Sequence, residues 1–470
     1  MNKRFLLCAF LIVSACLTFA QQPKYVFYFI GDGMGVNQVQ GTELYKGELE
    51  GKIGITPIQF AQYPYATVAT TFSATNGVTD SAAGGTALAS GHKTKNGTIG
   101  MEKDQQTSVN SIAVWAQNSG YKVGVATSVS VDHATPTAFY AHNADRNNYY
   151  EMGCDLYKTG FDFYAGSDFL DPDKKGKAES LYSLAEANGY TIARGYKDYL
   201  KKSKKAEKMI LFQTEKASQV ERESIPYAID RKKGDLTLSD ITRSAINFLT
   251  KEPSKGFFLM VEGGKIDWAC HSNDAATVFH EVMDLDNAVK VAYEFYAQHP
   301  DETLIVITAD HETGGIVLGT GAYKLNLQVL KNQKVSEVGF TRIINGLRAQ
   351  YKNNVPWEAV KKALKENFGF WEQVQLTEKQ EARLTKVYEE SFKGQNIQLE
   401  KSEYSQDEPI AAEAKRIINE IALVGWTSGG HSAGYVPVFA IGTGAELFQG
   451  RLDNTEIPMK IAKAAGYIAE

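Results

Sequence analysis

Carboxylate and imidazole side chains that could share metal ions recur in short polar or glycine-rich segments of the sequence. Asp267 and His271 are four residues apart, so a helical turn would direct both toward a single ion. Asp310 and His311 are adjacent, and both can reach one ion only where the backbone is irregular, as the glycines after them allow. His431 lies in a glycine-rich loop that could deliver a distant ligand. Mixed sets of imidazole and carboxylate ligands are typical of Zn²⁺ sites.

A second group of candidate ligands offers only oxygen atoms. Asp32, Thr135 and Glu262 supply carboxylate and hydroxyl oxygens, which predicts Mg²⁺. Each residue taken singly has a simpler interpretation, since an aspartate after a strand most often caps a helix. The glycines around Asp32 do not complete a dinucleotide-binding motif, because Val36 occupies the last glycine position. The combination of such residues in one chain is what indicates a metal centre.

Ser81 is the candidate nucleophile. It lies in a run of small residues, Val78–Gly91, which favours a closely packed helix that begins near Ser81 and stops at Gly91. The N-terminus of a helix attracts anions through its free N–H groups and the helix dipole. The simpler role for Ser81 is helix capping, whereas a serine beside divalent metals could be a nucleophile activated by coordination. The sequence has no G-x-S-x-G motif, so a nucleophile elbow of the α/β-hydrolase type is not supported.

Strand-like and helix-like segments alternate along the chain, which predicts an α/β fold with a central, mostly parallel sheet sandwiched by helices. Buried strands are predicted at Tyr25–Ile30, Val123–Val131, Phe257–Val261, Leu304–Thr308 and Val436–Ile441. Helices are predicted at Ser111–Asn118, Leu238–Leu249 and Ala275–Tyr296. Because the carboxyl ends of parallel strands line the ligand crevice of such sheets, we expect the candidate ligands that follow these strands to converge there.

Length and composition bound the class of protein. The chain has 470 residues, of which 43% are hydrophobic and 22% charged, and its formal net charge is −5. This composition excludes general disorder, and the absence of a long basic run argues against nucleic acid as a specific partner. We interpret residues 21–470 as a single catalytic domain with a mainly helical insertion at about 322–422. The insertion covers one flank in the simpler interpretation and forms a lid over a pocket in the other.

The first twenty residues are typical of a secretory signal peptide. Lys3 and Arg4 precede a short apolar run, and Ala20 is placed as the residue before the cleavage site. The run is too short for a comfortable transmembrane helix, so we expect no membrane span and a secreted or periplasmic protein. Lipid attachment at Cys16 is the alternative processing route. The mature chain would keep only Cys154 and Cys270, and the sequence leaves open whether they pair.

Taken in order, these segments resemble the alkaline phosphatase family. The resemblance runs from Tyr25 to about Ile316 and resumes from Trp426 to the C-terminus. The matching segments are Ile30–Gly35, Thr79–Ala83, His133–Pro136, Ala141-His142 with Arg146, Val261–Gly263 through Asp267 and His271, Thr308–His311, and Gly430-His431. The resemblance implies an exported, metal-dependent phosphomonoesterase that acts on small phosphate monoesters and releases inorganic phosphate.

The resemblance also implies a role for each matching residue. Ser81 would form a phosphoserine intermediate, Arg146 would bind the phosphate oxygens, and Asp80 would steady Arg146. The implied cofactors are two Zn²⁺ and one Mg²⁺. Asp267, His271 and His431 would hold one zinc, Asp32, Asp310 and His311 the other, and Asp32, Thr135 and Glu262 the Mg²⁺. A homodimer is a further expectation, because members of the family are commonly dimers.

Two positions vary within this family. His133 stands where some members have aspartate, and Trp268 stands where some have lysine. His133 would then lie next to the Mg²⁺ site and contact the waters of the ion, while Trp268 would give no positive charge to phosphate. We expect these differences to alter the binding of Mg²⁺ and of phosphate rather than the activity itself.

Other classes of function fit the sequence less well. A phosphodiesterase of the same superfamily shares the two-metal core and is the main alternative, but Arg146 together with Thr135 and Glu262 favours monoesters. A sulfatase would need a Cys-x-Pro-x-Arg or Ser-x-Pro-x-Arg motif, whereas two alanines follow Ser81. A protein that only binds metal or phosphate would not require this serine, and a nucleotide-dependent oxidoreductase would need the fingerprint that is missing around Asp32.

Overall fold

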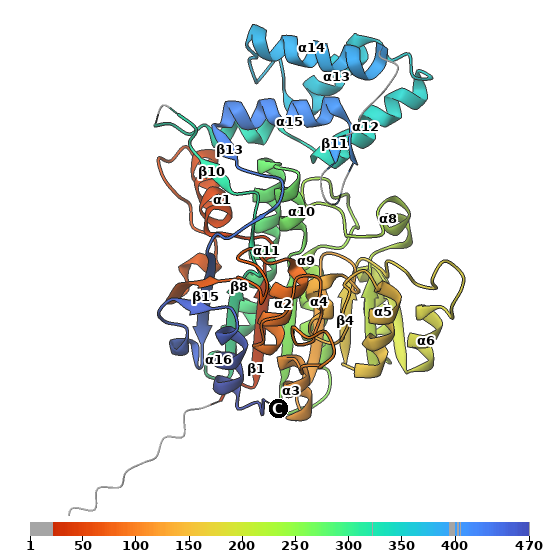
Figure 1. The fold of residues 1–470 in the computed structure, drawn as a ribbon, viewed down its shortest axis with the longest axis vertical. Coiled ribbons are helices and arrows are strands. Elements are labelled where there is room, and N and C mark those ends of the chain that lie inside the picture. Colours follow the sequence, from red (N-terminus) through yellow and green to blue (C-terminus); the bar gives the residue numbers. More distant parts are fainter. Residues whose placement is uncertain (1–21, 322, 394–399, 402–403, 405, 470) are drawn as a thin grey trace, which may run out of the picture.

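A ten-stranded sheet forms the centre of the molecule in the computed structural model, which describes residues 22–321, 323–393, 400–401, 404 and 406–469 (Figure 1). Its strands are β1 (Tyr25–Ile30), β2 (Tyr65–Thr70), β3 (Lys122–Thr127), β4 (Phe163–Gly166), β5 (Tyr190–Arg194), β6 (Lys208–Phe212), β7 (Phe257–Glu262), β8 (Thr303–Thr308), β15 (Val436–Gly442) and β16 (Leu452–Asp453). Their order is β16-β2-β15-β8-β1-β7-β3-β4-β6-β5. β15 is antiparallel to both of its neighbours, and the other pairings in this sheet are parallel. The predicted α/β fold with a mostly parallel sheet is confirmed.

The middle of the sheet is apolar on both faces. β7 and β8 are buried along their whole length, and β1 is buried except for Tyr25 at its start, which is the pattern of parallel strands covered on both sides. The register aligns their ends, because Ile30 lies opposite both Glu262 and Thr308. The next strand outward, β3, also ends opposite Glu262. Residues that follow these strands therefore start from one edge of the sheet.

One predicted strand is too long. We expected Val123–Val131, whereas β3 ends at Thr127. The Thr127 hydroxyl accepts a hydrogen bond from the backbone N–H of Val129 at 3.0 Å, and the N–H of Ser128 donates to the Glu262 carbonyl. These bonds turn the chain out of the sheet while it is still apolar and buried, which is why hydrophobicity alone does not show the end of the strand.

Helices cover both faces of the sheet. α9 and α11 pack on one face, and α2, α3 and α16 pack together on the other, in front of the strands in Figure 1. The predicted helices at Leu238–Leu249 and Ala275–Tyr296 have those bounds, and the third begins one residue later than predicted because Ser111 is its cap. The helices outside the 322–422 region are α1 (Val36–Leu49), α2 (Ser81–Ser90), α3 (Ile112–Asn118), α4 (Ala134–Thr137), α5 (Tyr149–Thr159), α6 (Leu181–Ala187), α7 (Tyr196–Lys202), α8 (Glu215–Val220), α9 (Leu238–Leu249), α10 (Lys265–His271), α11 (Ala275–Tyr296) and α16 (Glu456–Ala465).

The 322–422 region forms a cap at one end of the molecule, at the top of Figure 1. It contains α12 (Glu337–Gln350), α13 (Trp357–Phe368), α14 (Glu378–Lys393), α15 (Pro409–Ala422) and the short strands β11 (Glu400–Lys401) and β12 (Gln406–Asp407). The cap is fastened to the loop that follows α10. Lys415 Nζ donates to the Ser272 carbonyl at 2.5 Å and pairs with Glu337 at 2.9 Å, and Asn419 donates to the Asn273 carbonyl at 2.7 Å.

The structure bears on membrane crossing and on the pairing of the two cysteines. Across the described ranges, no helix combines the length and the apolar character that crossing a membrane would require. Cys154 on α5 and Cys270 on α10 are both free, so they do not pair with each other. The predicted signal peptide and the alternative lipid attachment at Cys16 lie outside the described residues.

Candidate active site and metal centre

Asp267, His271 and His431 meet at one point. Asp267 and His271 lie one turn apart on α10, and His271 Nε2 is 3.3 Å from Asp267 Oδ2. His431 arrives on the short strand β14 (His431–Ser432), which pairs with β9 (Glu312–Thr313), and its Nε2 is 3.1 Å from His271 Nε2 and 3.7 Å from Asp267 Oδ1. The Nδ1 atoms of His271 and His431 lie 2.6 and 2.8 Å from the carbonyls of Gly429 and Thr79. A carbonyl only accepts, so Nδ1 donates in both rings and Nε2 is left with its lone pair for a metal.

Asp32, Asp310 and His311 form a second cluster beside the first. His311 Nε2 is 3.3 Å from Asp32 Oδ1 and 3.5 Å from Asp310 Oδ2. Asp310 Oδ1 accepts hydrogen bonds from the backbone N–H groups of Gly33 and His311, which fixes the carboxylate and leaves Oδ2 facing the cluster. Gly33 has φ +71°, and a Cβ there would come 2.8 Å from the Cα of Asp267, so this turn requires glycine.

The third cluster lies on the β3 side of Asp32. Asp32, His133 and Glu262 each offer one ligand atom within 4.8 Å of the others, and these three side chains are buried. Thr135 is next to them but donates its hydroxyl to Asp310 Oδ2 at 3.3 Å. Sequence reasoning placed His133 only near this cluster, whereas its ring is close enough to be a ligand. It also missed Thr127, whose hydroxyl donates to Glu262 and holds that carboxylate. The feature that could have identified Thr127 is its position at the end of β3, directly opposite Glu262 on β7.

Ser81 lies in front of the second cluster. It is the first residue of α2, is fully buried, and places Oγ 3.2 Å from His311 Nε2. The cap of this helix is Asp80, whose Oδ1 accepts from the Ala83 N–H at 3.0 Å, so capping does not account for the serine. Gly91 ends the helix at φ +75°, as the sequence indicated. At Gly84 a Cβ would come 2.9 Å from the Asp310 carbonyl, so the small residues of α2 allow the helix to approach the loop that carries Asp310 and His311.

Arg146 reaches the same place from the loop before α5. Its Nη1 donates to Asp80 Oδ2 at 3.1 Å, and the Gly97 N–H donates to the same oxygen at 3.0 Å. Asp80 therefore caps the helix with one carboxylate oxygen and orients the guanidinium with the other. A planar guanidinium next to a helix N-terminus is suited to bind the oxygens of a tetrahedral anion.

The buried carboxylates of the three clusters would be stabilised by cations. Burial raises the pKa of Glu262 to about 8 and that of Asp310 to about 7. Burial, together with the charges of neighbouring carboxylates, also raises the pKa of Asp32 well above its usual range. Both oxygens of Asp32, one of Glu262 and one of Asp267 are buried without a hydrogen-bond donor among the residues that the structure describes. Buried carboxylates left in this state are costly, and divalent metal ions would compensate them. The donors present therefore fit metal ions at all three clusters.

Trp268 packs against Tyr404 and Lys265. It lies on α10 between Asp267 and His271, and its ring is stacked on Tyr404 with centroids 4.6 Å apart and planes at 9°. The Lys265 ammonium lies 4.6 Å from the Trp268 ring and 3.4 Å from that of Tyr227. Sequence reasoning missed both Lys265 and Tyr404. Tyr404 is distant from every motif, and no feature of the sequence marks it.

This fold and site define a class: a mostly parallel sheet with overlapping clusters that could hold metal ions at its carboxyl edge, beside a serine and an arginine, is an architecture typical of metal-dependent hydrolases. The family model described as alkaline phosphatase matches residues 23–160 and 181–467. The chain belongs to the alkaline phosphatase family, and it is a phosphatase.

Relatives support the assignment over nearly the whole chain. Alkaline phosphatase 3 of Bacillus subtilis (strain 168) is 32% identical over 454 residues, which cover 94% of this chain and 89% of the relative. Among solved structures, the cold-active alkaline phosphatase from a psychrophilic Shewanella sp. superposes with a TM-score of 0.78 at 29% identity, covering 94% of this chain and 99% of that one. A mutant of TAB5 alkaline phosphatase solved with Mg bound in its M3 site has a TM-score of 0.66 at 27% identity, covering 96% and 99% of the two chains.

Proposed function

We propose that this phosphatase is an exported phosphomonoesterase that works through a phosphoserine at Ser81. The observation that supports it best is the position of Ser81 Oγ, 3.2 Å from His311 Nε2 and at the N-terminus of α2. Because Asp80 caps the helix, capping does not explain why a serine is buried at this position. The twenty N-terminal residues, with their basic start and apolar run, support export.

Each cluster would hold one ion. Asp267, His271 and His431 would bind one Zn²⁺, and Asp32, Asp310 and His311 the other. Asp32, Glu262 and Thr135 would bind Mg²⁺, with His133 beside it. When bound, these ions would make hydroxyl and water oxygens more acidic and stabilise charge on the entering and leaving oxygens of the phosphoryl group.

The residues of the chain then account for two successive displacements. Ser81 Oγ, having lost its proton to solvent, bonds to phosphorus as the bond from phosphorus to the leaving alcohol breaks, and the alcohol takes up a proton. Water next attacks the phosphoserine, the Ser81–phosphorus bond breaks, and inorganic phosphate departs. Arg146, held by Asp80, stays on the non-bridging oxygens, where charge accumulates in both transition states. The N–H groups at the start of α2 would donate to the same oxygens.

Replacing Arg146 tests this assignment and separates it from a phosphodiesterase. We expect Arg146→Ala to lower kcat/KM for p-nitrophenyl phosphate by roughly a hundredfold, since a guanidinium bound to a charged oxyanion contributes about 2–3 kcal/mol. The loss for bis-p-nitrophenyl phosphate should be smaller, because a diester carries less charge. The two steady-state measurements are made on the same preparations, with Arg243→Ala as the control, since its side chain is nearly half exposed and its weak pair with Glu294 lies on the surface. Equal losses for both esters would show that Arg146 does not bind phosphate.

His133 should set the affinity for Mg²⁺. Burial lowers the pKa of this imidazole to about 3, so it stays neutral. A neutral imidazole suits Zn²⁺ better than it suits Mg²⁺, whereas a carboxylate suits Mg²⁺. We expect His133→Asp to lower the Mg²⁺ concentration for half-maximal activity by about tenfold. Excess Zn²⁺ should inhibit the wild-type protein more than this variant. The experiment titrates Mg²⁺ into chelated, zinc-reloaded samples of both proteins, and coinciding curves would contradict the role given to His133.

A further inference from the structure

The cap contributes the side chain of Tyr404 to the candidate active site. Tyr404, which lies between β11 and β12 in the chain, stacks on Trp268. Its ring centroid is 5.3 Å from that of His271 and 5.9 Å from that of His133, and it meets both rings edge-on. Tyr404 therefore spans the two sides of the metal centre. Figure 1 shows β11 on the side of the cap that faces α10.

Tyr404 is also close to the phosphate-binding arginine. Burial by itself lowers the pKa of Arg146, but the nearby oxygens of Tyr404 and Asp80 raise it and outweigh burial. The hydroxyl oxygen of Tyr404 is shielded from solvent, whereas the residue as a whole is only half-buried and lines a pocket. The ring thus has its polar end turned inward and part of its apolar surface available to a ligand.

That surface borders a pocket of about 770 Å³. The inner end of the pocket is formed by His133, Trp268 and Tyr404, and Tyr149 adds a fourth ring to the lining. The exposed residues of its lining, which form the outer rim, are Asn147, Lys175, Arg222 and Glu223. The pocket therefore leads from the metal centre to solvent, and its volume lies within the range of small-molecule sites.

A second observation at the inner end indicates a ligand. Trp268 is 5% exposed, and its Nε1 has no hydrogen-bond partner among the described residues. Buried indole N–H groups usually find a partner. An oxygen of a molecule in the pocket would supply one.

We propose that this pocket binds the alcohol part of the substrate and that Tyr404 makes the enzyme prefer phosphate monoesters whose alcohol carries an aromatic ring. The inference rests on the proposed phosphomonoesterase activity. With the phosphoryl group between Ser81 and Arg146, the alcohol must leave through open space, and the pocket beside His133 and Trp268 provides it. An aromatic ring there would pack on the rings of Tyr404 and Tyr149, whereas a short alkyl group would leave those rings in water.

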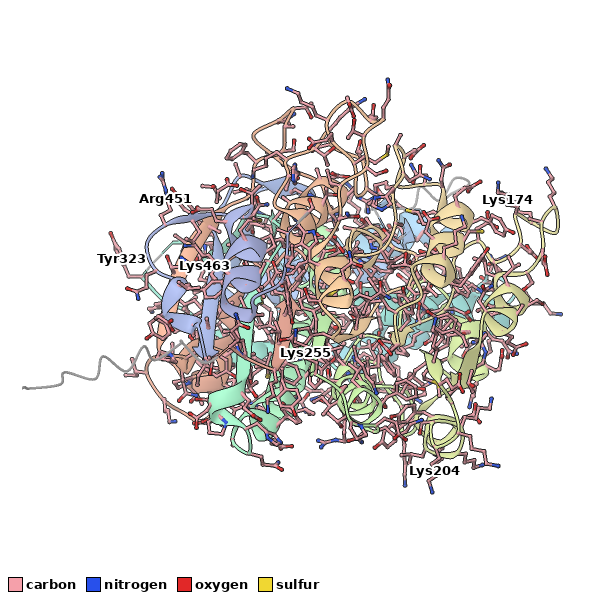
Figure 2. The ribbon with its side chains drawn as sticks, turned by 90° about the horizontal axis from the view of Figure 1, so that it is seen from below. Lys174, Lys204, Lys255, Tyr323, Arg451 and Lys463 are labelled. Atoms are coloured by element: carbon pink, nitrogen blue, oxygen red, sulfur yellow. The ribbon has the colours of Figure 1, made fainter. Side chains whose placement is uncertain are left out.

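The test compares phenethyl phosphate with ethyl phosphate, two esters whose alkoxide leaving groups differ little in reactivity. Tyr404→Leu should lower kcat/KM for phenethyl phosphate by roughly tenfold and change that for ethyl phosphate by less than about twofold. Tyr404→Phe, which keeps the ring, should retain the preference. Tyr323→Leu is the matched control, because Tyr323 is fully exposed and lies at the opposite edge of the molecule from Lys174, the neighbour of the rim residue Lys175 (Figure 2).

Binding provides a readout that does not require turnover. The wild-type protein should bind phenethyl phosphonate about tenfold more tightly than methyl phosphonate, and Tyr404→Leu should remove the difference. Equal affinities of the wild-type protein for the two phosphonates, or equal losses for both esters in Tyr404→Leu, would overturn the inference and leave the proposed activity standing. Failure of the wild-type protein to hydrolyse either ester would instead overturn the proposed function and the substrate preference with it.

Discussion

Ser81→Ala is expected to lower the turnover of a phosphate monoester by about three orders of magnitude or more, because loss of a nucleophile removes the covalent route altogether. The variant should keep its metal ions, since the clusters are built from other side chains. Residual hydrolysis is expected, because water can attack directly at an intact two-metal site.

The measurement is kcat for p-nitrophenyl phosphate with metal analysis of the same samples. Ser90→Ala is the matched control: Ser90 is a buried serine at the other end of α2, and its hydroxyl donates to the Thr86 carbonyl at 2.7 Å and accepts from the His92 N–H at 3.2 Å. Turnover of Ser81→Ala equal to that of Ser90→Ala would show that Ser81 is not the nucleophile. Thr79, whose hydroxyl lies just before the start of α2, would then be the next candidate.

Removal of the metal ions should give a folded protein that loses stability as the pH rises from about 6.5 to 8. Burial raises the pKa of Glu262 to about 8 and that of Asp310 to about 7. A carboxyl group whose pKa is raised by folding binds more protons in the folded state, so the free energy of unfolding falls as the pH rises from the unfolded pKa, near 4, through the folded one. Over this window Glu262 alone would cost about 2 kcal/mol.

The histidines change the free energy of unfolding in the opposite direction, and they do so over a lower pH range. Burial lowers the pKa of His133 and His311, so each is neutral in the folded state while its unfolded counterpart can be charged. The free energy of unfolding therefore rises with pH until the unfolded histidines have lost their protons, near 6.5. Between that pH and about 8 the buried carboxyl groups dominate, and above about pH 8 Lys265, whose pKa burial lowers to about 8, makes the free energy of unfolding rise again. In the metal-loaded protein the carboxylates are already deprotonated, and metal binding opposes the loss.

Urea unfolding of chelated and metal-reloaded protein at several pH values checks this prediction. Between pH 6.5 and 8 the free energy of unfolding should fall by about 2 kcal/mol more in the chelated sample than in the reloaded one, because Asp132, Glu281 and Lys265 contribute equally to both samples. Glu262→Gln serves as the comparison, because its free energy of unfolding after chelation should fall less with pH than that of the wild-type protein. A chelated wild-type protein whose stability is constant or rises over this range would contradict the electrostatic account of the site.

Much of the fold could be predicted from the sequence because its central strands are uniformly apolar. The predicted bounds of β1 and α11 match the structure, and those of β7 and β8 differ by one residue. The candidate ligands also lie where the strand ends predicted, since parallel register carries neighbouring strand ends to one edge of the sheet. Periodicity did not reveal the end of β3, because the chain turns there through a hydrogen bond from the Val129 N–H to the Thr127 hydroxyl while it remains buried.

Long-range packing explains what sequence reasoning missed. Tyr404 reaches Trp268 only because the cap folds over α10, and the contacts that fasten the cap, such as that of Lys415 with the Ser272 carbonyl, join residues far apart in the chain. The hydrogen bond from Thr127 to Glu262 depends likewise on the pairing of β3 with β7. No local pattern encodes either contact. They are fixed by the tertiary structure.

The central claim, hydrolysis in two displacements through Ser81, is tested most directly by the stereochemistry at phosphorus. A phosphate monoester made chiral with oxygen isotopes is turned over in the presence of an acceptor alcohol, and the configuration of the transferred phosphoryl group is determined. Each in-line displacement inverts the phosphorus centre. Retention of configuration is the predicted result, because transfer to Ser81 and then to the acceptor inverts it twice. Inversion would mean a single direct displacement and would contradict a phosphoserine intermediate.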